Sequence, residues 1–454
     1  MKITAIDIND FHQFKDFHID LTYPKGHEKE GQPLEKVCII GQSGTGKTTL
    51  LKLLNELISA KRTNRKKESQ GYPFTIFSFD FVIENYKGII GKFSEITQDL
   101  QSIYFENGNV NWHDKELDYY FEDGNVVLIN YPSELIDKSD VSENKGIDGP
   151  FKYITTEKRN SNIIKSEKEQ LKKKKIFDFE KDNPVEIWKS ILIDASDYMV
   201  KELSYSQRIA KALVKNTEEA NKILEEFKNW QNDNPSPFKE LAKVLNPVIE
   251  RFYIRIKSDF DFERAEDLQF IKMETIDGKE VPYNIWSTGT KQVVLTAIPI
   301  YKLNTKYAII LIDEPERSLY PDVQKEIIDY YTSLAPNAQF FFATHSPVIA
   351  SSFEPWEIVE LKFDYDKGLV FQEKYYNGER HVDNYFINPQ YLRWDSILTK
   401  IFDIKERGNE KRIEKLMELS SIGKKIEKEK NPKKKTEIYK EYKKLAELLD
   451  WEIK

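Results

Sequence analysis

The feature that most constrains the fold of this chain is a glycine-rich segment, residues 41–48, between an apolar run and an amphipathic helix. Its sequence, GQSGTGKT, fits the pattern G-x-x-x-x-G-K-[ST]. Residues 37–40 before it are entirely apolar, as in a buried strand, and leucines recur at helical spacing after it. Glycines let backbone N–H groups surround phosphate oxygens, and the helix N-terminus adds its dipole. The segment therefore predicts a phosphate loop at a strand–loop–helix junction of an α/β fold.

The same pattern assigns chemistry to individual side chains. Lys47 is expected to reach the β- and γ-phosphates of a nucleoside triphosphate, and the Thr48 hydroxyl is expected to bind Mg²⁺. The residues predicted to hold the nucleotide are Gly41, Gln42, Ser43, Gly44, Thr45, Gly46, Lys47, Thr48 and Thr49.

An apolar strand followed by acidic residues is the second chemical signal. The run YAIILI, at 307–312, leads directly into Asp313 and Glu314. In enzymes with a phosphate loop, the first such carboxylate holds Mg²⁺ and the second polarises the attacking water. Taken alone, the pattern also fits an ordinary strand-to-loop junction. Downstream of a phosphate loop it predicts that Asp313 is a metal ligand and Glu314 a catalytic residue.

Two further segments complete the set. Residues 287–292, STGTKQ, open a helix. Ser287 is a good N-cap and Gly289 leaves backbone N–H groups uncovered, so this turn can bind an anion, although plain helix capping is the favoured explanation of this motif in isolation. Residues 343–347, ATHSP, follow another apolar strand and place His345 at its end, where a lone histidine more often makes a structural hydrogen bond.

In this order, the four segments resemble those of the ABC ATPase superfamily. Residues 287–292 are similar to its signature motif, and residues 343–347 to its switch-histidine segment. The sequence DEPERSLYP, at 313–321, resembles the D-E-P-E-x-x-L-x-P form of the SMC, RecF and OLD-like branches. The pattern I-x-D-F-x-x-F at 8–14 is similar to the first strands of RecF-like heads. The resemblance spans about residues 1–375.

The resemblance implies an AAA-type ATPase with ATP and Mg²⁺ as cofactors and with Lys47, Glu314 and His345 as catalytic residues. His345 would stabilise charge on the γ-phosphate. In the superfamily the signature binds the γ-phosphate held by the opposite subunit, so Ser287 and Gly289 are expected to act in trans. ATP is therefore expected to join two copies into a homodimer or higher oligomer, and hydrolysis to release them.

This chain departs from the superfamily pattern in two places. No glutamine stands clearly at the position of the Q-loop, and Asn130 and Glu134 are the candidates there, after the predicted strand 126–130. OLD-family nucleases also carry a C-terminal Toprim domain with clustered acidic residues, and no such segment occurs before Lys454. We therefore expect any nuclease that works with this ATPase to be a separate protein.

Patterning along the chain divides it into four predicted segments. These are an N-terminal ATPase lobe (1–136), a polar insertion with a helical arm (137–252), a second ATPase lobe (253–375) and a helical tail (376–454). Residues 74–82, 88–93 and 126–130 are expected to form an antiparallel layer, and residues 61–72 a loop. The predicted fold is thus α/β, an ABC-type phosphate-loop ATPase head with an antiparallel β subdomain, an inserted helical segment and a helical C-terminal tail.

Composition limits the location and the partners. No window holds 18 uninterrupted apolar residues, and the single cysteine, Cys38, excludes an internal disulfide framework, so we expect a cytoplasmic protein without membrane partners. The net charge of −7 argues against a protein that coats nucleic acid. From 408 to 454, however, 14 Lys and Arg accompany 10 acidic residues, a local +4 that can contact DNA phosphates or can simply be a solvated helix face.

Three functions fit these features. The first is a nucleotide-gated sensor of DNA or foreign components that controls a partner effector, a nuclease or toxin, in an antiphage operon of the Septu or retron kind. The second is a DNA-repair or chromosome-maintenance ATPase that clamps DNA directly, for which steep salt dependence of DNA binding is the discriminating observation. The third is the ATPase subunit of a transporter, which normally has shorter spacing between motifs than the 246 residues from Gly41 to Ser287.

Overall fold

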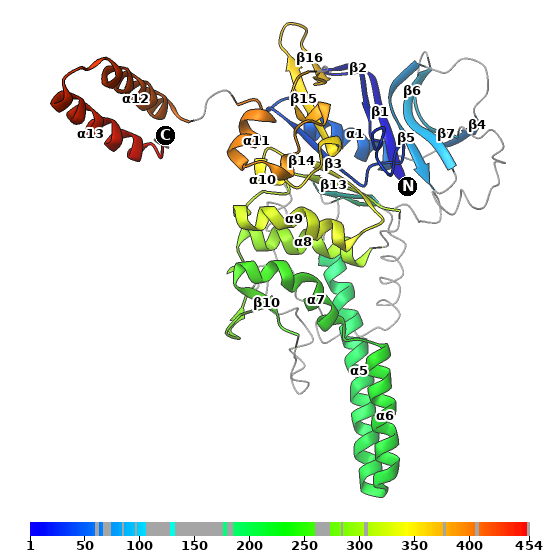
Figure 1. Ribbon diagram of the computed structural model, residues 1–454. Coiled ribbons are helices and arrows are strands. Elements are labelled where there is room, and N and C mark those ends of the chain that lie inside the picture. Colours follow the sequence, from blue (N-terminus) through cyan, green and yellow to red (C-terminus); the bar gives the residue numbers. More distant parts are fainter. Residues whose placement is uncertain are drawn as a thin grey trace. The chain divides into compact units, whose positions relative to one another are not determined.

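One large sheet organises the computed structural model (Figure 1). The structure describes residues 1–59, 63–66, 74–83, 86–95, 98–105, 128–131, 176–178, 185–258, 273–282, 285–303, 307–375, 378–404 and 408–451. Thirteen of the described strands belong to this sheet, in the order β4-β7-β6-β5-β1-β2-β16-β15-β3-β14-β13-β8-β9. Their bounds are β1 Lys2–Phe11, β2 Phe14–Asp20, β3 Lys36–Gly41, β4 Thr63–Lys66, β5 Phe74–Ile83, β6 Tyr86–Glu95, β7 Gln98–Phe105, β8 Leu128–Tyr131, β9 Ile176–Asp178, β13 Ile309–Asp313, β14 Gln339–Ala343, β15 Ile358–Asp364 and β16 Leu369–Gln372.

One side of the sheet is parallel and carries the predicted motifs. The strands β15, β3, β14, β13, β8 and β9 pair with one another in parallel. Strands β3, β13 and β14 contain continuous buried apolar runs, which are typical of strands covered on both faces. Asp313 pairs in register with Ala343, and Ala343 pairs with Ile39. Because parallel strands end at the same edge, the loops that follow β3, β13 and β14 leave the sheet side by side.

The other side of the sheet is mainly antiparallel, with β4 parallel to β7 at its edge, and curls around one helix. Strand β1 pairs antiparallel with β2 and β5, and β6 and β7 continue the antiparallel order. Helix α1 (Lys47–Ser59) packs against β6 of this side and against β3, β13 and β14 of the parallel side (Figure 1). Its Leu50 and Leu54 are fully buried in the core between the two sides. Burying each leucine contributes about 1.5–3 kcal/mol, so α1 helps to hold the two sides of the sheet together.

A second helical layer covers the other face of the parallel strands. It consists of α7 (Pro237–Ile249), α8 (Thr288–Lys302) and α9 (Pro321–Leu334), which contact one another (Figure 1). Helices α5 (Val185–Lys215) and α6 (Thr217–Asp233) form an antiparallel pair that extends away from this layer. The base of α5 contacts α7 and α8, where Lys302 Nζ lies 2.9 Å from Asp194 Oδ2. The helices and the short arm expected over residues 184–252 are thus present.

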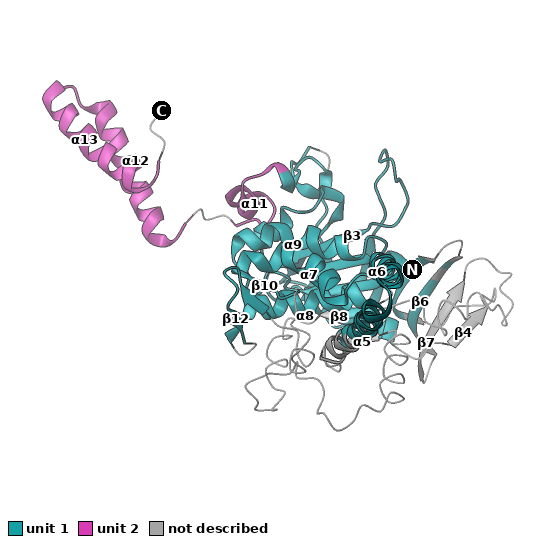
Figure 2. Ribbon diagram, turned by 90° about the horizontal axis from the view of Figure 1, so that it is seen from below, with its two compact units in different colours: residues 1–390 teal, residues 391–454 magenta. Residues whose placement is uncertain are grey.

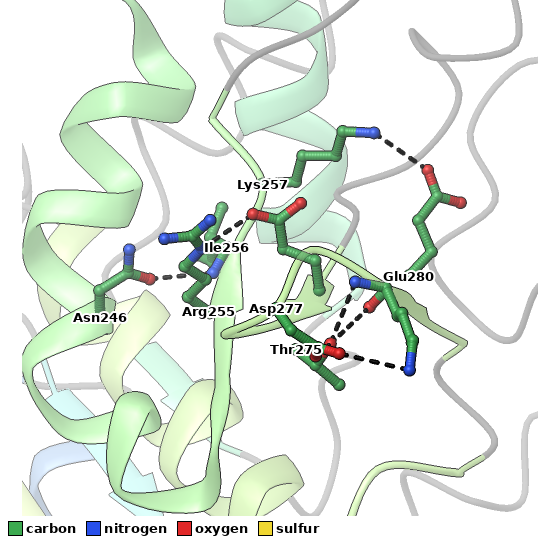
Figure 3. Close-up of polar contacts among 9 residues, drawn as sticks. Asn246, Arg255, Ile256, Lys257, Thr275, Asp277 and Glu280 are labelled. Carbon is green, nitrogen blue, oxygen red and sulfur yellow. Dashed lines mark hydrogen bonds and ion pairs between the residues drawn. The ribbon is translucent and has the colours of Figure 1, made fainter.

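A small sheet and short helices complete the larger unit. Strands β10 (Ile254–Ile256), β11 (Met273–Thr275) and β12 (Glu280–Val281) pair antiparallel, and cross-strand ion pairs join Arg255 to Glu274 and Lys257 to Glu280 (Figure 3). Asn246 Oδ1 accepts a hydrogen bond of 2.9 Å from Ile256 N, which ties this sheet to α7. The short helices are η2 Glu250–Phe252, α10 Pro347–Ala350, η5 Pro355–Glu357, η6 Val382–Asn384 and η7 Pro389–Tyr391.

The described chain divides into two compact units, residues 1–390 and 391–454 (Figure 2). The second unit contains α11 (Trp394–Lys400), α12 (Glu410–Lys428) and α13 (Pro432–Leu448). Helices α12 and α13 pack together around a small apolar cluster that includes Leu419, Leu445 and Leu449. The apolar side chains of α13 therefore pack against α12. Within the described ranges, every helix is too short or too polar to span a bilayer.

The structure corrects three expectations about individual elements. Strand β8 joins the parallel side beside β13, whereas the sequence analysis placed residues 126–130 in the antiparallel layer. A short apolar run has no alternation that distinguishes the two environments, so this assignment was wrong. Residues 63–66, expected in a loop, form the edge strand β4, and residues 176–178 of the expected insertion form the edge strand β9. Most of the expected insertion, 137–183, lies outside the described residues, and the division into four segments stays a prediction.

Candidate nucleotide-binding site

The phosphate loop connects β3 to α1 and depends on glycine at two positions. Gly44 and Gly46 have φ angles of 86° and 88°, a region that other residues rarely adopt. A Cβ at Gly46 would lie 2.7 Å from Gln13 Nε2 and 2.7 Å from a ring carbon of Phe14, whereas the space beside Gly44 is open. The turn between β1 and β2 therefore supports the loop from one side and leaves its other side open, as a cradle for phosphates requires.

Lys47 lies at the first position of α1 with its side chain folded over the loop. Its Nζ donates hydrogen bonds to Gly41 O at 2.9 Å and to Gln42 O at 3.2 Å. Burial lowers the pKa of Lys47 to about 8, and the nearby carboxylates of Asp313 and Glu314 oppose that shift. The ammonium is therefore largely charged at neutral pH but held in a partly desolvated position, where a polyphosphate would be its strongest partner.

Thr48 and Asp313 meet although 265 residues separate them in sequence. The Thr48 hydroxyl donates a hydrogen bond of 2.7 Å to Asp313 Oδ2. Burial raises the pKa of Asp313, and the hydrogen bond from Thr48 opposes this. A hydroxyl and a carboxylate at this separation beside a phosphate loop are oxygen ligands of the kind that Mg²⁺ prefers. The donor set thus fits Mg²⁺, which Thr48 and Asp313 would hold.

Glu314 follows Asp313 with an unusual backbone conformation. Its φ angle is 52°, in the left-handed region, and its N–H donates a hydrogen bond of 2.8 Å to Ala343 O at the end of β14. A non-glycine residue in this region costs about 1–3 kcal/mol and persists where neighbouring structure fixes it. The neighbouring strand therefore holds the backbone that carries the second carboxylate.

Glu316, for which no role was predicted, connects the acidic segment after β13 to the segment after β14. Glu316 Oε1 accepts hydrogen bonds from Thr344 Oγ1 at 2.7 Å and from His345 N at 3.1 Å. Burial raises the pKa of Glu316, and these hydrogen bonds oppose that shift. His345 itself is exposed in part, and partial burial followed by the charge of Lys47 lowers its pKa. Both causes favour the neutral imidazole, which can donate one N–H to a phosphate.

The turn at residues 287–290 begins α8 and presents two different surfaces. Ser287 Oγ accepts a hydrogen bond from Thr290 N at 3.1 Å, so Ser287 is an N-cap as expected. Ser287 is exposed, whereas Gly289 is buried, and a Cβ there would lie 2.6 Å from Ser318 O. Glycine at 289 therefore permits close contact with the loop that follows Glu314. Among the described residues, no hydrogen bond joins Ser287 or Gly289 to Lys47, Thr48 or Asp313.

The structure thus gathers Lys47, Thr48, Asp313 and Glu314 at the edge where β3, β13 and β14 end. Within the loop, Gln42, Ser43 and Gly44 are exposed, Thr45 is buried, and Thr49 is half-buried. Of the Q-loop candidates, Asn130 lies in β8, paired with Leu311 of β13, and Glu134 lies outside the described residues. Their role stays a prediction.

The chain is similar in sequence to known ATPases. A family model described as an AAA ATPase domain matches residues 1–350. A curated relative, the "Retron Vc95 probable ATPase" of Vibrio cholerae, is 25% identical over 176 residues, which are 36% of this chain and 32% of the relative. The chain thus matches about a third of that relative's length.

Solved structures of SMC heads are also similar in part. The SMC head domain of Pyrococcus furiosus with an extended coiled coil, bound to the C-terminal domain of ScpA, has a TM-score of 0.41 at 14% identity, with 82% of this chain and 96% of that chain covered. The SMC head domain from Thermotoga maritima has a TM-score of 0.39 at 10% identity, with 83% and 100% covered.

Proposed function

The chain belongs to the AAA ATPase domain family, and from this premise we propose that it hydrolyses ATP at composite sites formed between two copies. The observation that carries the proposal is the hydrogen bond between Thr48 and Asp313, because it brings the phosphate loop and the acidic strand end to one point. Lys47 over the loop and Glu314 beside Asp313 supply the remaining groups that phosphoryl transfer to water requires.

Each residue has a definite part in the proposed reaction. The loop backbone and Lys47 bind the β- and γ-phosphates. Thr48 and Asp313 hold Mg²⁺, which when bound neutralises charge on the phosphate oxygens. Glu314 orients and polarises the attacking water, and His345 donates a hydrogen bond to the γ-phosphate, which stabilises the negative charge on the transferring group. Ser287 and the start of α8 in the second copy close the site from the opposite side.

Mixing two inactive variants tests the composite site. Lys47→Ala removes the phosphate contact, and Ser287→Arg blocks the exposed turn while leaving the phosphate loop intact. In an equimolar mixture, half of the dimers are mixed, and each mixed dimer has one intact site out of two. We therefore expect about a quarter of wild-type turnover from the mixture and none from either variant alone. Sites completed within one chain would give no recovery on mixing.

A second experiment isolates the role of Glu314. Glu314→Gln keeps the shape of the side chain but removes the charge that polarises water, so ATP is expected to bind without turnover and to hold the dimer together. Light scattering with size exclusion would measure the dimer, and the double variant Lys47→Ala/Glu314→Gln is the control that should stay monomeric. Wild-type turnover in the Glu314→Gln variant would remove Glu314 from this role.

We further propose that the ATP-bound dimer senses DNA or foreign components and controls a separate effector, a nuclease or toxin, in antiphage defence. The name of the relative from Vibrio cholerae supports this setting, because it denotes an ATPase of a retron. Protection against phage by the chain together with its operon neighbour should be lost in Lys47→Ala and in Glu314→Gln. Co-purification of the neighbour's product would identify the effector, and full protection without ATP binding would exclude a nucleotide-gated switch.

Direct DNA clamping is the second candidate, and the lysines around the α12–α13 turn favour it. Helix α12 ends with Lys424, Lys425 and Lys428, and α13 begins with Lys433, Lys434 and Lys435. A clamp that uses such contacts should lose DNA affinity steeply as salt rises, with a log–log slope of about −0.9 for each phosphate contact. Effector control without DNA contact predicts no such dependence.

A further inference from the structure

A cavity of ≈ 540 Å³ lies in the larger unit, away from the segments that form the nucleotide site. The loop after β2, the start of β15, the end of β16 and helices η5 and η6 line it. None of its lining residues belongs to the phosphate loop, to the acidic segment after β13 or to the segment after β14. Its volume suits a small organic ligand or an inserted side chain and far exceeds that of an inorganic ion.

Aromatic rings form a connected wall of this cavity. The ring of Trp356 meets that of Tyr385 edge-on at a centroid distance of 6.2 Å, and meets that of His27 at 5.1 Å. His27 in turn stacks on Tyr23 at 4.5 Å. Trp356, Tyr385 and Tyr23 all line the cavity, and Tyr385 is half exposed. Rings fixed against one another keep their faces in place, so a ligand can stack on them at little entropic cost.

Three carboxylates line the same cavity: Asp20, Glu30 and Asp383. Asp20 Oδ1 accepts hydrogen bonds from Thr22 N at 2.9 Å and from Thr22 Oγ1 at 2.7 Å, and Glu30 Oε2 accepts one from Gly26 N at 2.9 Å. These bonds position Asp20 and Glu30, neither of which has an ion pair among the described residues, whereas Asp383 Oδ2 lies 3.7 Å from His381 Nδ1. Burial raises the pKa of Tyr385, and the charges of Asp20 and Asp383 raise it further, so both carboxylates act on the space beside this ring.

The cationic side chains of the cavity lie where water can solvate them. Lys25 and Lys374 both line the cavity and both are exposed. Asp20 and Glu30 are exposed as well, so exposure does not distinguish the acids from the lysines; the cavity lining holds three carboxylates and two lysines, and therefore carries an excess of negative charge. Gln372, whose Oε1 is a buried acceptor without a hydrogen-bond partner among the described residues, also lines the cavity. The cavity thus offers carboxylate acceptors, aromatic faces and a net negative lining, so a matching ligand is a hydrogen-bond donor with positive charge.

We propose that this cavity binds an organic cation, a guanidinium or alkylammonium group, which stacks on Trp356 and Tyr385 and pairs with Asp20 and Glu30. Aromatic faces attract cations, and carboxylates bind a guanidinium through paired, charge-assisted hydrogen bonds. The cation can belong to an arginine or lysine side chain of a partner protein or to a free amine. The site is separate from ATP hydrolysis, so it can be tested without nucleotide and independently of the proposed function.

Calorimetry on the full-length protein with matched peptides tests the proposal. The probes are Ac-Gly-Arg-Gly-NH2 and the same peptide with citrulline, which has the shape of arginine but no charge. We expect the arginine peptide to bind and the citrulline peptide to bind at least about tenfold more weakly. Agmatine and spermidine, as free amines, distinguish the sources: tighter binding of either than of the peptide identifies a small molecule, and the reverse identifies a protein side chain.

Charge variants then locate the binding. Asp20→Asn and Glu30→Gln keep the oxygen acceptors that Thr22 and Gly26 use, so the double variant should fold, with its melting temperature as the check. It should lose arginine-peptide affinity about tenfold or more, whereas Lys374→Ala should bind the peptide equally or more tightly. Equal binding of the arginine and citrulline peptides, no binding of any probe at millimolar concentration, or weaker binding only in Lys374→Ala would each overturn the proposal.

Discussion

The lowered pKa of Lys47 predicts how the dissociation constant for ATP depends on pH. Its pKa of about 8 results first from burial at the base of the phosphate loop. A bound triphosphate would place several negative charges beside the ammonium and return its pKa to above 10. Binding therefore takes up a proton wherever free Lys47 is deprotonated. The apparent dissociation constant rises with pH, because the neutral amine must be protonated first.

The magnitude follows from the pKa alone. With a pKa of about 8, the fraction of free Lys47 that is neutral is about 10% at pH 7, 50% at pH 8 and 90% at pH 9. The apparent dissociation constant should thus rise about tenfold from pH 7 to pH 9. The proton uptake should be about half a proton per bound nucleotide at pH 8. A lysine with its ordinary pKa, near 10.4, would give almost no change over this range.

Calorimetric titration with a slowly hydrolysed ATP analogue and Mg²⁺ measures both quantities. Repeating the titration at pH 8 in buffers of different ionisation enthalpy gives the proton uptake directly. His345→Asn provides the control, because His345 is the other titratable cation proposed to contact the γ-phosphate: the rise of the dissociation constant from pH 7 to pH 9 should persist in this variant if Lys47 causes it. Constant affinity from pH 7 to pH 9, without proton uptake, would refute the argument that burial lowers the Lys47 pKa.

Three further predictions follow from single contacts. Gly289→Ala places a Cβ 2.6 Å from Ser318 O and should lower the free energy of unfolding by about 1–3 kcal/mol, measured in urea. Thr48→Val removes the hydroxyl bonded to Asp313 and should weaken Mg²⁺-dependent ATP binding about tenfold while metal-free binding is kept, measured by titration with and without EDTA. Burial raises the pKa of Glu357 to about 7, so the folded state retains a proton that the unfolded state has lost between about pH 4.5 and 7. Stability should fall over that window by up to about 3 kcal/mol, and Glu357→Gln should abolish the fall in thermal melts at pH 5 and 8.

Much of the site could be predicted because its residues follow apolar strands directly. Residues 37–40 and 309–312 are continuous apolar runs, and in a parallel sheet such runs end at a common edge. Lys47, Thr48 and Asp313 could therefore be expected together, and Thr48 and Asp313 are in contact. The order of the strands could not be predicted in the same way. Strand β14 lies between β3 and β13 although it is the last of the three in sequence, and a local pattern does not encode such a crossover.

The hydrogen bonds to Glu316, the third carboxylate in the segment 313–316, also could not be predicted from the sequence. Glu316 is one of several acidic residues after β13, and its sequence position alone does not distinguish it from Glu314. The left-handed backbone at Glu314 and a second left-handed residue at Ser318 reverse the chain between them. That reversal turns Glu316 inward to accept hydrogen bonds from Thr344 and His345. The left-handed backbone at Glu314 and Ser318 thus accompanies the inward position of Glu316, and sequence periodicity does not report such backbone conformations.

The turn at residues 287–290, where the proposed second copy would dock, contacts the segment that carries the reacting carboxylate. Its exposed Ser287 is free to meet another molecule, while its buried Gly289 touches the backbone of Ser318. Ser318 lies four residues after Glu314, in the same strained segment that holds Glu316 against His345. A nucleotide held by the partner and bound at Ser287 would therefore act on the segment 314–318, with which this turn is in contact. Because left-handed residues at both ends fix the path of this segment, its backbone has little freedom to move. For this reason we expect that docking of a second copy at Ser287 also shifts the carboxylate of Glu314, which activates the water.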